Sequence, residues 1–316
     1  AEMPLFVRGL AKIGAKVYGF GDQPVQALAE DARSALTDYL RVDSFSDEAK
    51  VVEDVRAWMR GKSIDRVECM WERLMYLAAT LRETFTVPGM NKAQTVIVRD
   101  KELMKQAVES AGLRVPRHGR ARSVREAWEV LEGVGYPAIL KPIDGAGSVD
   151  TYRCNDRQEF EEALKKTRHV EELSVEEFIE GEELTYDTVC ADGEILFENV
   201  AWYRPKPMVL AQNPWISMQN IVLRDIQDEF PRPGVALGHG VLKALGFESG
   251  FTHMEWFRTA AGEAVFGEIG GRPPGARLVA EPPHTGCAVR RCLQGPESRR
   301  SKMKRTACVG AVGGAV

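Results

Sequence analysis

Two glutamates near the end of the sequence could hold a metal ion. Residues 251–270, FTHMEWFRTAAGEAVFGEIG, show two strand-like runs joined by a turn that contains glycine. With residues 260–263 as the turn, the expected cross-strand pairs are Thr259 with Ala264, Phe257 with Phe266 and Glu255 with Glu268. The Cβ atoms of residues paired in this way lie roughly 5 Å apart. The two carboxylates repel unless one is protonated or a cation lies between them, and Mg²⁺ favours such ligands. The alternative is a solvated hairpin with two unrelated surface charges.

A lysine and a glycine-containing loop are suited to binding phosphate. The apolar strand 138–141 ends at Lys141, and the loop after it carries Gly145, Gly147 and Ser148. The ammonium group is a point charge, and glycine lets backbone N–H groups approach phosphate oxygens closely. The loop does not match GxxxxGK[ST], so it is not a Walker-type site. A hairpin with a flexible tip is the alternative.

Further charged residues gather at three places. They are Lys101 and Lys105 on one helix face, then Glu176, Glu177, Glu180, Glu182 and Glu183 within eight residues, then Arg204 and Lys206 in a long Pro-containing loop over 204–220. A solvated surface is the ordinary interpretation of the lysine pair and of the acidic turn. A loop of that length often forms a lid or a binding site, so Arg204 and Lys206 are candidates for binding an anionic substrate.

The elements that must position these residues fall into two patterns. Residues 15–22 and 64–71 are expected to be strands, with a helix over 47–61 between them, which is the alternation of a parallel α/β layer. The chain already looks helical at 3–10, so we expect a preceding first strand to be missing. After residue 91, two helices follow, the second capped by Asp100, and residues 173–203 are expected to form short strands and hairpins.

Composition sets outer limits on function. The chain has 316 residues, 44% hydrophobic and 28% charged, with a formal net charge of −4, which is typical of a globular protein of two or three domains. This charge gives no case for nucleic acid or an anionic membrane surface as partner. No apolar run approaches the roughly 20 residues of a membrane span, so a cytoplasmic protein is expected. The six cysteines lack CxxC spacing, which argues against zinc and a disulfide framework.

The motifs stand in an order that resembles the ATP-grasp superfamily. The strand, Lys141 and the glycine loop come first, then EEFIEGEEL, then the glutamate hairpin ending in EIGGR. The resemblance implies α/β and α+β architecture, with a Rossmann-like N-terminal domain followed by an ATP-grasp fold of two α+β subdomains that clasp ATP. The implied boundaries are 1–90 for the first domain, 91–280 for the ATP-grasp domain with its lid subdomain at about 117–180, and 281–316 for an atypical tail.

The same resemblance implies roles for individual residues. Lys105 and Lys141 are similar to the two lysines that contact ATP phosphates, and Gly145, Gly147 and Ser148 to the loop that closes over them. Glu176, with the backbone of Glu177 and Ile179 and with Phe178 between them, resembles the segment that recognises the adenine edge. Glu183 resembles the ribose ligand, Glu255 and Glu268 the metal ligands, and Arg272 the arginine that steadies the transferred phosphoryl group. Arg272 and Lys141 are therefore the expected catalytic residues.

The activity implied is that of an ATP- and Mg²⁺-dependent ligase, with Mn²⁺ as another suitable ion. It would phosphorylate a small carboxylate substrate to an acyl-phosphate, join it to an amine or other nucleophile, and release ADP and phosphate. A bicarbonate- or formate-activating carboxylase, a purine-biosynthesis type of enzyme and a non-catalytic ATP-binding module are the alternatives. Neither nucleic acid nor a membrane is an expected partner, and a homodimer is left open.

Two departures from the family pattern stand out. Many members read E-x-N-x-R after the second strand of the hairpin, where the Asn is a further metal ligand, but this chain has Gly270 at that position. Water or His253 would have to compensate. From about residue 281 the sequence loses amphipathic periodicity and is rich in Arg and Lys, so we expect a disordered or altered C-terminus.

Overall fold

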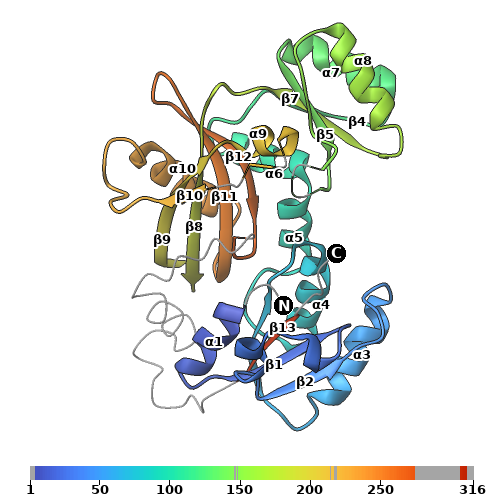
Figure 1. The fold of residues 1–316 in the computed structure, drawn as a ribbon, viewed down its shortest axis with the longest axis vertical. Coiled ribbons are helices and arrows are strands. Elements are labelled where there is room, and N and C mark those ends of the chain that lie inside the picture. The colour runs from blue at the N-terminus through green and yellow to red at the C-terminus, as the bar shows by residue number, and fades with distance from the viewer. Residues whose placement is uncertain are drawn as a thin grey trace.

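The computed structural model describes residues 4–145, 147, 149–213, 215–216, 219–274 and 307–311. These residues form three sheets, with helices α5 (Lys92–Arg99) and α6 (Lys101–Ser110) running between the lowest sheet and the other two (Figure 1). The mixed α/β and α+β class expected from the sequence is confirmed. No helix among the described residues is long and apolar enough to cross a membrane.

The first sheet is parallel, as the alternation of strands and helices predicts. Its strands are β1 (Lys16–Gly21), β2 (Asp38–Arg41), β3 (Ile64–Cys69) and β13 (Ala307–Ala311), in the order β2-β1-β13-β3. Its helices are α1 (Pro4–Lys12), α2 (Glu30–Arg33), α3 (Glu48–Trp58) and α4 (Met75–Phe85), with single 3-10 turns at Val25–Ala27 and Glu72–Leu74.

The strand β13 corrects one expectation about the tail. We expected a disordered or altered C-terminus from about residue 281, but residues 307–311 pair with β1 on one side and with β3 on the other, so this segment is not disordered. Parallel pairing on both sides satisfies the backbone groups of this segment, which the loss of helical periodicity could not reveal. The rest of the expected tail, 281–306 and 312–316, lies outside the described residues.

The second sheet, the lid sheet, has its own apolar core. It consists of β4 (His118–Ala121), β5 (Ala138–Pro142), β6 (Tyr152–Cys154) and β7 (Leu173–Glu177) in the order β4-β7-β5-β6, with helices α7 (Val124–Val134) and α8 (Arg157–Lys166). Phe160 and Leu140 are fully buried in this core. Asp100 caps α6 as expected, and its carboxylate also pairs with Arg120 of β4 at 2.6 Å, which ties the lid sheet to α6.

The third sheet, the central sheet, is antiparallel and carries the glutamate hairpin. Its strands are β8 (Gly181–Ala191), β9 (Glu194–Arg204), β10 (Gln219–Val222), β11 (Gly250–Thr259) and β12 (Ala264–Gly270) in the order β10-β9-β8-β11-β12. Helix α9 (Pro207–Gln212) interrupts the stretch that we expected to be a loop; proline suits the first position of a helix, because its missing N–H has no partner there. Helix α10 (Arg232–Ala244) packs on the sheet through Gly234 and Gly238.

The hairpin register is right at the glutamates and wrong nearer the turn. Glu255 pairs with Glu268, as predicted, but Trp256 pairs with Phe266 and Phe257 with Val265. A β-bulge after Glu255 leaves Gly267 without a partner, and a Cβ atom there would lie 2.8 Å from the Glu255 carbonyl oxygen. The turn therefore shifts the outer pairs by one residue, and the bulge restores the pairing of the two carboxylates.

The contact between α10 and the central sheet generates a stability prediction. A Cβ atom at Gly234 would lie 2.0 Å from the ring of Trp256, which is fully buried. Gly234→Ala should therefore lower the free energy of unfolding by about 1–3 kcal/mol through overpacking, as measured by chemical denaturation. Gly133→Ala is the matched control: it lies in α7 with no atom near its Cβ position, and it should raise stability by up to about 1 kcal/mol. Equal stability of the two variants would contradict this packing.

Candidate active site

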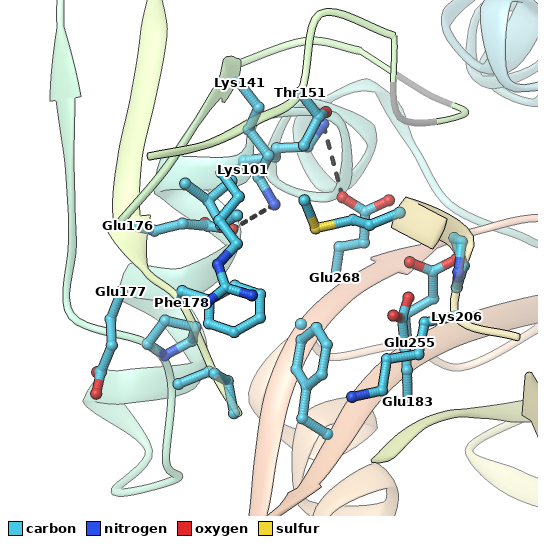
Figure 2. A pocket seen from close by; sticks show the side chains of 18 of the residues that line it. Lys101, Lys141, Thr151, Glu176, Glu177, Phe178, Glu183, Lys206, Glu255 and Glu268 are labelled. Carbon is cyan, nitrogen blue, oxygen red and sulfur yellow. Dashed lines mark ion pairs between the residues drawn. The ribbon is translucent and has the colours of Figure 1, made fainter. Parts of the chain in front are cut away.

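A cavity of about 310 Å³ lies between the lid sheet and the central sheet (Figure 2). Its apolar wall includes Ile139, Phe178, Ile179, Met208 and Phe257. Lys101 and Lys141 enter it from α6 and β5, and Glu183, Glu255 and Glu268 enter it from the central sheet, whereas Glu176 and Glu177 belong to β7 of the lid sheet. The cavity thus offers an apolar slot at one place and opposed charges at another.

Most of the residues singled out in the sequence line this cavity. They are Lys141, Gly145, Gly147, Glu176, Glu177, Phe178, Ile179, Glu183, Glu255 and Glu268. Lys105 and Arg272 do not line it, and Ser148 lies outside the described residues. Lys206, considered as an anion binder, also lines the cavity at the start of α9.

Glu176, in the wall of the cavity, is held between two lysines. Its carboxylate pairs with Lys105 Nζ at 2.7 Å and with Lys141 Nζ at 2.5 Å. Burial would raise the pKa of Glu176, but the two ammonium groups lower it to about 2. Burial lowers the pKa of Lys105, whose side chain is 1% exposed. The contact of Lys105 with phosphate stays a prediction, because in this structure its ammonium group forms an ion pair with Glu176.

Glu255 and Glu268 are the paired carboxylates of the cavity that could hold a metal ion. The two residues face each other across β11 and β12, and Glu183 lies close enough that burial, and next the charge of Glu255, raise its pKa to about 8. Such crowding of carboxylates calls for a cation. Among the described residues no group of three or more His, Cys, Asp or Glu side chains that could hold a metal ion is found. Mg²⁺ is usually bound by one or two carboxylates together with phosphate oxygens and water.

Lys101 lines the cavity, although no feature of the sequence favoured it over Lys105. Its ammonium donates to the Gly145 carbonyl oxygen at 2.7 Å and lies 3.7 Å from Glu268 Oε2 (Figure 2). Burial raises the pKa of Glu268, but the charges of Lys101 and then Lys141 outweigh this effect. The pKa therefore lies below its ordinary value, and the carboxylate stays charged. Lys101 therefore links the glycine loop to the carboxylates; its sequence signal was the spacing of one helical turn from Lys105, which does not say which lysine reaches the site.

His253 lies between Asp187 and Glu255 of the carboxylate pair. Its Nδ1 pairs with Asp187 at 2.5 Å, and its Nε2 lies 3.7 Å from Glu255 Oε1. Burial lowers the pKa of His253, but Asp187 and Glu255 raise it to about 9. Nδ1 is thus engaged by Asp187, and compensation for Gly270 by His253 stays a prediction.

The segment from Glu176 to Ile179 forms the apolar end of the cavity. The backbone N–H groups of Glu177 and Phe178 donate to Arg117 and Pro137 carbonyl oxygens. Within the described part of the chain, the N–H of Ile179 has no such partner and stays available to a ligand. The Glu177 side chain pairs with Arg114 at 3.1 Å. Arg153, another residue that sequence reasoning missed, lies over the ring of Phe178 at 4.0 Å.

Comparisons with known proteins agree with this geometry. Residues 134–277 match a family model described as an ATP-grasp domain. An L-arginine-specific L-amino acid ligase of Bacillus subtilis is 27% identical over 254 residues, which cover 74% of this chain and 60% of that protein. This chain therefore spans less than two thirds of the length of that ligase.

Solved structures with the same fold include two enzymes. An L-amino acid ligase from Bacillus licheniformis is similar with a TM-score of 0.70 and 20% identity, over 90% of this chain and 76% of that one. The ADP complex of N5-carboxyaminoimidazole ribonucleotide synthetase gives a TM-score of 0.71 and 18% identity, over 92% of this chain and 74% of that one. At these identities the likeness establishes the fold.

The two lysines around Glu176 generate a prediction about acid stability. The pKa of Glu176 lies at about 2, below its ordinary value of 4.5, so its charged form contributes stability above about pH 4.5 that is lost as the pH falls toward 2. Glu176→Gln should therefore be least stable relative to the wild type near neutral pH, and the difference in unfolding free energy should shrink by up to about 3 kcal/mol between pH 6 and pH 2. Urea denaturation at each pH measures it.

The matched control is Glu161→Gln, since Glu161 is in an exposed helical pair with Arg157. This variant should follow the wild type at every pH. A difference between Glu176→Gln and the wild type that stays constant from pH 6 to pH 2 would contradict the charge assignment.

Proposed function

Because residues 134–277 match the ATP-grasp domain model, we propose that the chain is an ATP- and Mg²⁺-dependent ligase of the ATP-grasp superfamily that activates a small carboxylate and joins it to an amine. The observation that carries the proposal is the pairing of Glu255 with Glu268 inside a cavity that also holds Lys101 and Lys141. The two carboxylates suit a metal ion, and the two ammonium groups suit the polyphosphate of a nucleotide. All four groups lie in a cavity and not on a solvated surface, so a bound nucleotide with its metal ion would balance their charges.

The apolar end of the cavity suits the adenine base. Ile139, Phe178, Ile179 and Phe257 offer flat and apolar contacts, and the Ile179 N–H is available to donate a hydrogen bond to an adenine ring nitrogen. The pKa of Glu183 is raised, and the charge of Lys206 acts on its carboxyl group. Glu183 is therefore suited to form hydrogen bonds with the ribose hydroxyls. These roles are carried over from the family resemblance, and the geometry supports them.

The chain's residues would assist the reaction by position and charge. A substrate carboxylate oxygen forms a bond to the γ-phosphorus of ATP while the bond from that phosphorus to the bridging oxygen breaks, and ADP takes the electron pair. The amine nitrogen then attacks the acyl carbon, phosphate leaves and the amine loses a proton. Burial lowers the pKa of Lys141, but Glu176 and then Glu268 raise it above its ordinary value, so its ammonium stays charged to bind the phosphates. When bound, Mg²⁺ would be held by Glu255 and Glu268 and would neutralise negative charge on the phosphates.

The chain matches only part of the length of the curated ligase, so the identity of the acid and the amine is not carried over from it. A homodimer and a cytoplasmic location stay predictions from the sequence.

Loss of one metal carboxylate should abolish turnover. Glu268→Ala should lower kcat by about 10³-fold or more while leaving the unfolding midpoint near that of the wild type, because the carboxylate acts on the nucleotide and its metal. Glu263→Ala is the matched control on the same hairpin, since Glu263 lies at the turn and is more than half exposed, and it should keep wild-type activity. Near-normal activity of Glu268→Ala in excess ATP and Mg²⁺ would contradict the metal assignment.

A screen for ADP release tests the proposed activity itself. Amino acids and other small acids are added with ATP and Mg²⁺, alone and in pairs, and ADP is measured by a coupled assay. We expect ADP release that requires both an acid and an amine. Release with bicarbonate alone would favour a carboxylase, and tight ATP binding without ADP release from any pair would favour a binding module.

A further inference from the structure

Glu72 is held between two arginines at the edge of the first sheet. It lies in the 3-10 turn just after the carboxyl end of β3, the edge at which α/β sheets present ligand-binding residues. Its Oε1 accepts from Arg99 Nη1 at 2.8 Å, and its Oε2 pairs with Arg272 Nε. The side chains of Glu72, Arg99 and Arg272 are 12%, 10% and 18% exposed, so the three charges are largely removed from water.

Arg272 is fixed at two of its three nitrogens. Its Nε is paired with Glu72, and its Nη1 donates to the Pro273 carbonyl oxygen at 2.8 Å. Among the described residues, Nη2 has no partner. A guanidinium anchored in this way has a fixed plane and keeps one nitrogen free for an anion, whereas an unpaired arginine would sample many rotamers.

Gly270 leaves the space that this pair occupies. A Cβ atom at Gly270 would lie 3.2 Å from Glu72 Oε2 and 3.5 Å from Arg272 Cγ. Any larger side chain would therefore have to displace the carboxylate or the arginine. Where many family members have Asn, this chain has Gly270, and the carboxylate of Glu72 from the first sheet lies beside it.

The same glutamate is connected to the glycine loop. Arg99 pairs through Nη2 with Asp144, which directly precedes Gly145, and the Gly145 carbonyl accepts from Lys101. The anchor that fixes Arg272 is therefore continuous with the loop expected to bind phosphate.

We propose that Glu72 is the positioning residue for Arg272, and that Gly270 is required because it leaves room for this pair. The proposal rests on the proposed function, since it assigns Arg272 to the transferred phosphoryl group. Glu72 does not touch substrate; it fixes the guanidinium so that Nη2 meets the anion. Both oxygens of Glu72 are engaged by arginines, which distinguishes this role from a replacement metal ligand for the absent Asn.

The test compares Glu72→Gln, Arg272→Ala and the double variant. Glu72→Gln keeps the shape of the side chain and removes its charge, so kcat should fall about 10²-fold through misplacement of Arg272. The KM for ATP and the Mg²⁺ concentration for half-maximal rate should each change less than about threefold, because ATP and metal are held elsewhere. In the Arg272→Ala background, Glu72→Gln should cause no further loss, since the two residues act as a unit.

Two further variants separate positioning from general stability. Glu68→Gln is the matched control, because Glu68 lies on β3 and pairs with a buried arginine, Arg82, at 3.7 Å; it should shift the unfolding midpoint yet keep the wild-type kcat. Gly270→Ala should lower kcat in the wild type and have no added effect on kcat in the Glu72→Gln background.

Three results would overturn the proposal. They are a wild-type kcat for Glu72→Gln, losses from Glu72→Gln and Arg272→Ala that multiply in the double variant, and a raised Mg²⁺ requirement with kcat restored at saturating Mg²⁺. The last result would make Glu72 a metal ligand. Wild-type protein that releases no ADP with any acid and amine would instead contradict the proposed function, and the coupling of Glu72 and Arg272 would then be measured by a double-mutant cycle on unfolding free energy.

Discussion

The candidate active site depends on one buried charge arrangement, the Glu176 carboxylate between the ammonium groups of Lys105 and Lys141. The three residues come from β7, α6 and β5, so a single carboxylate joins the lid sheet to the helix beside it. Removing one partner would leave an uncompensated buried charge, which is far more costly than replacing the whole set. This requirement fixes where Lys141 enters the cavity and leaves Lys101, one turn earlier on α6, to reach the glycine loop.

The opposite wall of the cavity is acidic for an equally local reason. The bulge at Gly267 brings Glu255 and Glu268 into register, and β8 adds Glu183 beside them. Lys101 and Lys141 thus come from α6 and the lid sheet, and Glu183, Glu255 and Glu268 from the central sheet. A nucleotide with its metal ion satisfies both walls at once, which neither an anion nor a cation alone would do. Opposed charge across the two sheets is therefore the basis of the functional proposal.

Much of this site could be predicted from the sequence because its signals are local. The strand ending at Lys141, the acidic segment after it and the two glutamates of the hairpin are each visible within a few residues. The pairing of Glu255 with Glu268 was right although the outer pairs were wrong, because the assumed turn and the unseen bulge compensated. Helix α9 was missed since the prolines around it suggested a loop, and spacing alone could not separate the role of Lys101 from that of Lys105.

Contacts between distant segments could not be predicted. Glu72 and Arg272 are separated by 200 positions, and their pairing depends on how the first sheet sits against the hairpin. Likewise, β13 lies between β1 and β3, although nothing in its five residues specifies those neighbours. Gly270 was visible as a departure from a pattern, but only the structure shows which side chain fills the space beside it.

The central claim is that the substrate carboxylate itself is phosphorylated, and oxygen-isotope transfer tests it most directly. An acid that supports ADP release is labelled with ¹⁸O in its carboxylate and turned over with ATP, Mg²⁺ and the amine, and the released phosphate is analysed by mass spectrometry. Acyl-phosphate formation requires one labelled oxygen in each phosphate, because the bond to the acyl carbon breaks when the amine attacks. Phosphate without label would contradict the account.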